Sequence, residues 1–115
     1  MSQSNEQIAT AFSNHEFEQT YAYLADDIVW DNVGGAELAG KADVVDACDQ
    51  ATAYFATITM SFNRFRAVVG EGSVVIDSLA TYVDEQNDSS SVASCDIYDF
   101  EDGQLARITS YTIEV

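Results

Sequence analysis

The chain is poor in positive charge, because its 115 residues contain only four Lys or Arg against 20 Asp or Glu. The resulting net charge is −16. A protein that binds nucleic acid needs a positive surface to neutralise phosphates, so that class is excluded. Anionic membrane surfaces are disfavoured for the same reason. No apolar run approaches the roughly 20 residues of a transmembrane helix, and we expect no membrane partner.

Histidine and cysteine are also scarce, and proline is absent. The single histidine, His15, argues against a zinc site, a catalytic triad or a histidine-dependent dehydratase, and we expect it to be solvated at a helix cap. Cys48 and Cys95 are expected to be buried thiols rather than a disulfide framework. The N-terminal residues show neither a basic segment nor an apolar signal core. We therefore expect a cytoplasmic protein with no metal and no other cofactor.

Apolar residues are abundant, at 47% of the chain, and they include six Phe, six Tyr and one Trp. This content favours a globular fold over disorder. A chain of this length buries roughly 65% of its unfolded surface when it folds. We therefore expect one domain over residues 1–115 with a substantial core.

The first half of the chain predicts three helices and one short strand. A capping box at Ser4 and Gln7 begins the first helix, and a second box at Ser13 and Glu16 begins another, which ends at 26–27. A strand at 28–31 follows, and the third helix begins at residues 40–43. The apolar stripes at helical spacing are Ile8, Ala11 and Phe12; Phe17, Tyr21 and Leu24; and Val44, Cys48, Ala51 and Phe55.

The second half predicts four long strands, at Ile58–Val69, Ser73–Asp84, Ser90–Phe100 and Gln104–Val115. Tight turns at 70–72 and 101–103 and a polar loop at 85–89 connect them. Short connections between consecutive strands indicate an antiparallel meander. Helices followed by strands are typical of an α+β fold.

The strand predicted at Ser73–Asp84 is apolar on both faces. One face carries Val75, Asp77 and Leu79, and the other carries Val74 and Ile76. A sheet open to water on one side normally alternates apolar and polar residues. Helices can cover one face, and we expect a second subunit to cover the other, which predicts a homodimer.

Two aspartates lie in strand-like runs of β-branched and aromatic residues. Asp31 follows Ile-Val-Trp, and Asp96 precedes Ile-Tyr. A carboxyl in an apolar environment has a raised pKa, because desolvation disfavours the charged form. Two such carboxyls facing one cavity would serve as a proton-transfer base and a neutral hydrogen-bond donor. The pair therefore predicts proton transfer on a small apolar molecule.

Each candidate also has a purely structural interpretation. Asp31 could end a strand and bond to the backbone before a turn. Asp96 could face solvent, although it shares a strand face with Tyr98 and Phe100. Asp77 either lines the cavity or lies exposed or at a bulge. The aromatic residues could equally be core or pocket lining.

The layout resembles the nuclear transport factor 2-like superfamily, and within it the SnoaL-like and ketosteroid isomerase-like branch. Three segments carry the resemblance: Leu-Ala-Asp-Asp-Ile-Val-Trp at 24–30, Leu-Ala-Gly-Lys at 38–41 and Cys-Asp-Ile-Tyr-Asp-Phe-Glu-Asp-Gly-Gln-Leu at 95–105. The element order matches over nearly the whole chain. The resemblance implies three N-terminal helices packed on a curved antiparallel sheet, which form a cone with an apolar pocket at its open end.

The resemblance also implies roles for individual residues. Ketosteroid isomerases carry their base in a segment similar to Trp30–Gly35, which places Asp31 on the base and Asp96 on the neutral donor. The sequence departs from the family where Ile8 and Phe12 replace the oxyanion tyrosine of the first helix. Ser94 likewise replaces the arginine that limonene epoxide hydrolases carry two residues before an aspartate. We expect Asp31 and Asp96 to be the catalytic residues. We expect the pocket to be lined by Ile8, Phe12, Trp30, Phe55, Asp77 and Tyr98.

Three functions remain open at this point. The first is an isomerase or cyclase that uses Asp31 as a base on an apolar carbonyl compound. The second is a non-catalytic module that binds a small hydrophobic molecule in the same cone. The third is a structural dimer with a filled cavity. An open pocket that both carboxyls face favours the isomerase or cyclase. A pocket lined only by apolar groups favours the binding module, and the absence of a pocket favours the structural dimer.

The charge balance generates a prediction about stability. A net charge of −16 repels itself in the compact state, and ions screen that repulsion beyond about 10 Å at 0.1 M salt. We expect the melting temperature to rise by several degrees between low and sub-molar sodium chloride at fixed pH. A flat or falling melting temperature would contradict this.

Overall fold

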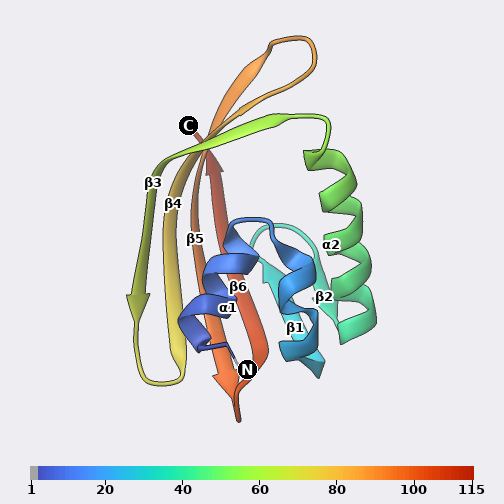
Figure 1. Ribbon diagram of the computed structural model, residues 1–115, viewed down its shortest axis with the longest axis vertical. Helices are drawn as coiled ribbons and strands as arrows, with labels where there is room; N and C mark the ends of the chain where they lie inside the picture. The colour runs from blue at the N-terminus through green and yellow to red at the C-terminus, as the bar shows by residue number, and fades with distance from the viewer. Residues whose placement is uncertain (1–2) are drawn as a thin grey trace.

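The computed structural model describes residues 3–115, and it is an α+β fold with a curved six-stranded sheet and three helices (Figure 1). The first two residues of the N-terminal segment lie outside the described residues. The elements in chain order are α1 (Asn5–Ser13), the 3₁₀ helix η1 (Phe17–Tyr23), β1 (Leu24–Asn32), β2 (Glu37–Ala39), α2 (Lys41–Phe55), β3 (Thr59–Val69), β4 (Ser73–Val83), β5 (Ser89–Glu101) and β6 (Gln104–Glu114). Within residues 3–115 there is no helix with the length and hydropathy that crossing a bilayer requires.

The predicted antiparallel meander is confirmed for β3 to β6. The strand order in the sheet is β2-β1-β6-β5-β4-β3, so each of the last four strands pairs with its neighbour in sequence. The β5–β6 turn has Asp102 and Gly103 at φ 52° and 79°, the left-handed conformation that a two-residue hairpin turn requires. β1 extends the sheet by pairing in parallel with β6, and β2 pairs with β1 at the edge of the sheet. The sequence did not predict the parallel pair.

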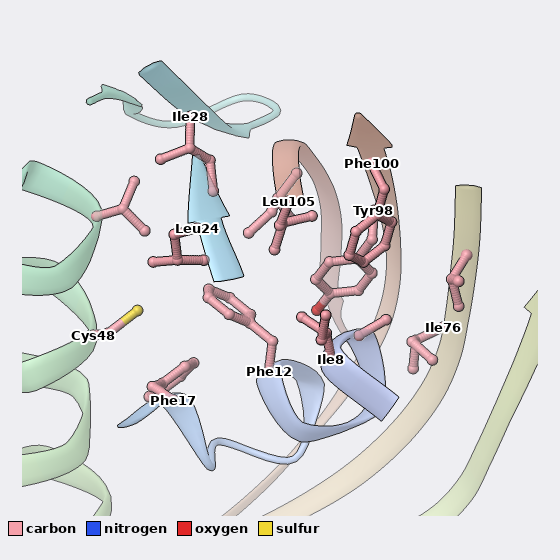
Figure 2. Close-up of a cluster of buried hydrophobic side chains, with 14 residues drawn as sticks. Ile8, Phe12, Phe17, Leu24, Ile28, Cys48, Ile76, Tyr98, Phe100 and Leu105 are labelled. Atoms are coloured by element: carbon pink, nitrogen blue, oxygen red, sulfur yellow. The ribbon is translucent and has the colours of Figure 1, made fainter. Parts of the chain in front are cut away.

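The helices cover one face of the sheet (Figure 1). The capping box predicted at Ser4 and Gln7 is present in both directions, and it begins α1 so that Ile8 and Phe12 face the sheet. Figure 2 shows these two side chains beside Tyr98 of β5. The buried core cluster consists of Ile8, Ala9, Phe12, Phe17, Leu24, Ile28, Val44, Cys48, Val74, Ile76, Tyr98, Phe100, Leu105 and Ile108.

The second helix differs most from its prediction. It is a 3₁₀ helix that ends at Tyr23, and no side-chain hydrogen bond caps its N-terminus. The predicted capping box at Ser13 and Glu16 is therefore wrong, because Ser13 bonds instead to Tyr98 of β5. Residues 26–27 do not end a helix. They are exposed positions inside β1, where the register against β6 is irregular.

The face of the sheet away from the helices, here called the outer face, concentrates positive charge. Asp77 lies between Arg64 and Arg66, at N–O distances of 3.2 and 3.3 Å. Arg107 pairs with Asp31 at 3.3 Å. Lys41, the fourth cation of the chain, begins α2 instead. The outer face is thus locally balanced in charge, although the chain as a whole is strongly acidic.

The same face exposes apolar side chains. Tyr111 and Ile113 follow Arg107 on one face of β6 and are 47% and 64% exposed. An apolar strip of this kind normally needs a cover. Two copies of a protein with net charge −16 repel each other least where their cations are gathered. Both observations favour association through the outer face.

We therefore expect a homodimer formed through the outer face. Ile113→Asp, which adds a charge to the apolar strip, is expected to weaken dimerisation about tenfold or more. Val33→Asp is the matched control, because Val33 is also exposed, at 47%, but lies in the turn after β1. Light scattering at micromolar concentration gives the mass, and a wild-type mass of one chain would disprove the dimer.

Candidate functional site

A cavity of about 240 Å³ lies between the inner face of the sheet and the helices. Residues from both α-helices and from five strands line it, together with the segment that follows α1. The lining residues are Phe12, Ser13, His15, Phe17, Trp30, Asn32, Ala51, Phe55, Phe62, Ser78, Ala80, Tyr82, Val92, Ser94, Asp96, Tyr98, Ser110 and Thr112. The lining thus combines seven Phe, Tyr or Trp rings with seven Ser, Thr, Asn or Asp side chains.

Packing between rings fixes the inner end of the cavity. Phe12 makes edge-to-face contacts with Phe17, Trp30 and Tyr98, at centroid distances of 4.9, 5.1 and 5.8 Å. This geometry is the preferred one for aromatic pairs. Because the three partners of Phe12 come from η1, β1 and β5, the contacts join helices and sheet around the cavity. The expectation that Phe12, Trp30, Phe55 and Tyr98 line the pocket is consistent with this arrangement.

Asp96 is the carboxyl group of the cavity. It lies on β5 directly opposite Ser110 of β6, and its carboxyl is hydrogen-bonded by the hydroxyls of Ser110 and Ser13. Ser13 Oγ in turn lies 2.5 Å from the Tyr98 hydroxyl. On the other side, Trp30 Nε1 donates to Ser110 Oγ at 3.0 Å. Asp96 therefore stands at the centre of a five-residue network.

The donors in this network all point toward Asp96. A serine hydroxyl has one proton, so when Ser13 donates to the carboxylate, Tyr98 must donate to Ser13. Ser110 likewise donates to Asp96 while it accepts from the indole N–H of Trp30. Both arms thus end on the same carboxylate, which they hold in one orientation. Such a fixed orientation is what a proton-transfer group requires.

Burial and hydrogen bonding act in opposite directions on Asp96. Burial raises the pKa of the Asp96 carboxyl above its ordinary value, and the bonds from Ser110 and Ser13 lower it by a smaller amount. Burial also raises the pKa of Tyr98 well above its ordinary value, so its hydroxyl remains a donor. Carboxyls whose pKa is raised by burial are among the groups that enzymes use as general acids or bases near neutral pH.

His15 is one of the cavity residues that the sequence interpretation missed, as are Ser13, Asn32 and Ser110. It does not lie solvated at a helix cap: its ring lines the cavity, stacked on Phe55 at a centroid distance of 4.1 Å. Its backbone has φ 63°, a left-handed conformation in which histidine is enriched among non-glycine residues. Burial lowers the pKa of the imidazole. The break at 14–15 was visible in the sequence, but the direction of the ring was not.

Asp31 and Asp77 do not reach the cavity. Trp30 and Asn32 line it, so the alternation of β1 turns Asp31 to the outer face, where it pairs with Arg107. Asp77 points the same way, to Arg64 and Arg66. The expectation that Asp31 and Asp96 share one cavity is wrong, and so is the placement of Asp77 in the lining. The residue of this segment that lines the cavity is Asn32.

Ile8 also lies outside the cavity lining. It has no exposed surface and belongs to the core cluster beneath α1. It therefore supports the wall of the site without facing the ligand space. Among residues 3–115, no group of three or more His, Cys, Asp or Glu side chains is arranged to hold a metal ion.

The raised pKa of Asp96 has a consequence for stability. The folded state binds this proton more readily than the unfolded chain, so the stabilisation is complete below pH about 4 and is lost as the pH rises through the folded pKa. We expect Asp96→Asn to raise the melting temperature at pH 7 relative to wild type, with the gain shrinking toward pH 4. Asp31→Asn, whose carboxylate is paired on the outer face, is the control and should show no such gain. A loss of stability in Asp96→Asn that is the same at every pH would contradict the assignment.

Comparison with known proteins gives matches for the family and for the fold. The SnoaL-like domain family matches residues 5–108. Among solved structures, an NTF2-like protein of unknown function from Cytophaga hutchinsonii is 32% identical with a TM-score of 0.83, covering 94% of this chain and 95% of that one. No curated protein matches the chain.

Two further structures share the fold at lower identity. A candidate polyketide cyclase from Xanthomonas campestris pv. campestris is 20% identical, with a TM-score of 0.70 and coverage of 94% of this chain and 92% of that one. An LEH-like epoxide hydrolase from M. tuberculosis is 17% identical, with a TM-score of 0.69 and coverage of 90% and 75%. At these identities the likeness concerns the fold alone. The family match over most of the chain, together with the helices, curved sheet and cavity described above, shows that this chain belongs to the SnoaL-like domain family and has the NTF2-like fold.

Proposed function

We propose that the cavity binds a small apolar carbonyl compound and that Asp96 transfers a proton on it, as an isomerase or cyclase does. The observation that carries this proposal is the placement of Asp96. It is a largely buried carboxyl on the cavity wall, held by Ser13 and Ser110, and none of the four Lys or Arg residues lines the cavity with it. A purely structural aspartate would gain more from solvent or from a cation.

The chemistry that this placement supports is proton transfer next to a carbonyl. The Asp96 carboxylate takes a proton from the carbon beside the carbonyl, and the electron pair of the broken C–H bond moves onto the oxygen to give an enolate. The protonated Asp96 then returns the proton to another carbon of the same conjugated system, and the carbonyl re-forms. Hydrogen-bond donors near the developing oxyanion lower the barrier. Asn32 lines the cavity and carries an amide N–H that can donate. Ser94 and Thr112 also line it, and because their hydroxyls lie 3.3 Å apart and share one hydrogen bond, one proton of the pair remains for such a role.

A second candidate is a non-catalytic module that binds the same kind of molecule. The observation that favours it is that, among residues 3–115, Asp96 is the only carboxylate in the cavity lining. The aromatic wall alone would suffice to bind an apolar ligand. The third reading, a structural dimer with a filled cavity, fits poorly with a cavity of about 240 Å³.

Exchange of protons beside a carbonyl tests the proposal directly. We expect the wild-type protein to accelerate hydrogen–deuterium exchange, or double-bond migration, in members of a panel of small cyclic enones, followed by NMR. Loss of a general base typically costs about 10²–10⁴ in rate, and we expect that loss in Asp96→Asn. Asp31→Asn is the matched control, since it removes the same group from the outer face, and its rate should stay within about twofold of wild type.

Two results would change the assignment. Full activity in Asp96→Asn would remove Asp96 from the proton-transfer role. Tight binding of the ketones by the wild-type protein, with no exchange in any member of the panel, would favour the non-catalytic module.

A further inference from the structure

The two hydroxyl arms that hold Asp96 differ in kind. One arm runs from the indole N–H of Trp30 to Ser110 Oγ at 3.0 Å, and from Ser110 to the carboxyl. The other runs from the Tyr98 hydroxyl to Ser13 Oγ at 2.5 Å, and from Ser13 to the same carboxyl. An indole N–H can only donate, whereas a tyrosine hydroxyl can donate or accept. The direction of the Ser13 arm therefore depends on what surrounds Tyr98.

The surroundings of Tyr98 are apolar. Its side chain is 1% exposed, and its partners on the adjacent strands, Val74 and Ile108, are fully buried. Phe12 packs edge-on against its ring at a centroid distance of 5.8 Å (Figure 2). A buried hydroxyl without a partner is costly, so the bond to Ser13 fixes the hydroxyl of Tyr98. Burial raises the pKa of that hydroxyl well above its ordinary value, which keeps the proton on it.

Ser13 is placed to connect Tyr98 with Asp96. It is the last residue of α1, and its hydroxyl reaches both side chains. Asp96 and Tyr98 are two residues apart on β5, so they share one face of the strand, with Cα atoms about 6.5 Å apart. One hydroxyl group bridges such a separation. Tyr98 thus acts on the carboxyl through Ser13.

This arm favours the ionised form of Asp96. When the carboxyl is ionised, Tyr98 donates to Ser13 and Ser13 donates to Asp96, so every proton in the arm has an acceptor. Hydrogen bonds that end on a charged group are about twice as strong as neutral ones, and donors in series strengthen one another. When the carboxyl is protonated, the arm ends on a neutral group and that gain is lost.

The other titratable groups around Asp96 offer it no positive charge. Burial raises the pKa of Tyr82 on β4 and of Cys95 on β5, and it raises the pKa of Cys48 on α2 to about 12, so these groups are neutral at pH 7. Burial lowers the pKa of the His15 imidazole, which is therefore neutral as well. The charged side chains of the neighbouring strands lie in pairs on the outer face: Asp31, Arg64, Arg66, Asp77 and Arg107.

From this arrangement we propose that Tyr98 is a positioning residue: through Ser13 it holds Asp96 in the ionised form and in the fixed orientation that a proton-abstracting base requires. The inference rests on the proposed function, and it adds an order of events. Asp96 begins as a base, so the substrate must give up a proton before it receives one. A carbonyl compound that reacts through an enolate meets this requirement. An epoxide that needs an acid to open its ring does not.

The titration of Asp96 itself tests the inference. The protein is produced with ¹³C-labelled aspartate carboxyls for NMR, and the signal missing from Asp96→Asn identifies Asp96. We expect its titration midpoint to rise by about one pH unit in Tyr98→Phe, because a hydrogen-bond arm that ends on the charge is weakened. This variant preserves the ring that packs on Phe12. Tyr111→Phe is the matched control, since it removes the same hydroxyl from an exposed position on β6, and it should leave the midpoint unchanged.

A double-variant cycle shows whether Tyr98 acts through Ser13. Ser13→Ala removes the hydroxyl that donates to Asp96, and it should raise the midpoint by at least as much as Tyr98→Phe. When Tyr98→Phe is added to Ser13→Ala, we expect no further shift, because the connection is already broken.

The pH dependence of the rate gives a second readout. On an enone that the wild-type protein isomerises, kcat/KM of Tyr98→Phe is expected to fall up to about tenfold on the acidic side of the profile and to change little at high pH, since the acidic limb moves by about one unit. A merely structural defect would lower the rate by the same factor at every pH.

Three results would overturn the inference: an unchanged or lowered midpoint in Tyr98→Phe, an equal shift with and without Ser13, or a rate loss that is the same at every pH. Failure of the proposed function looks different. An active protein whose midpoint does not move would overturn the role of Tyr98 alone. A midpoint that moves as expected in a protein that isomerises no enone would refute the proton transfer, and with it the role of Tyr98 in that reaction.

Discussion

Successive side chains of a β-strand point to opposite faces of a sheet, and in this protein the alternation separates two kinds of aspartate. Asp31 and Asp77 lie on the outer face with arginine partners. Asp96 lies on the inner face with hydroxyl partners only. The aspartates of the first kind are satisfied charges at a surface. Asp96 retains a proton more readily than a solvated carboxyl would, and this difference makes the cavity chemically distinct from the rest of the molecule.

The position of Asp96 conflicts with the stability of the fold. A carboxyl that loses solvent without gaining a cation opposes folding once it is ionised. The network that surrounds it, from Tyr98 through Ser13 and from Trp30 through Ser110, offsets part of that cost and ties α1 to the sheet. Groups that destabilise the folded state and are nevertheless held in one orientation are typical of functional sites. The same argument applies to His15, whose left-handed backbone and buried Nδ1, which has no hydrogen-bond partner within residues 3–115, also oppose folding.

Most elements of the fold were predictable, because they depend on local patterns, but β2 and the 3₁₀ form of η1 were not. The capping box at Ser4 and the turns around Gly72 and Gly103 are positions where only a few residue types suit the backbone conformation. The four long strands lie within a residue or two of their predicted bounds. The face of each side chain was less predictable. If the segment around Asp31 is aligned with the family's base segment one position out, Asn32 takes the place of Asp31. Such a shift by one residue moves a side chain to the opposite face of the sheet. His15 was missed for a different reason, since a single left-handed residue between two helices leaves no periodic signal.

The hydrogen bond from Trp30 to Ser110 has a consequence for how this molecule can be observed. Trp30 is the only tryptophan of the chain, it borders the cavity, and its indole N–H is one hydroxyl away from the carboxyl of Asp96. Protonation of that carboxyl and arrival of a guest both change the surroundings of the one indole. The natural sequence therefore contains an optical reporter at the position where its chemistry is expected, and neither a label nor a substitution is needed to read it.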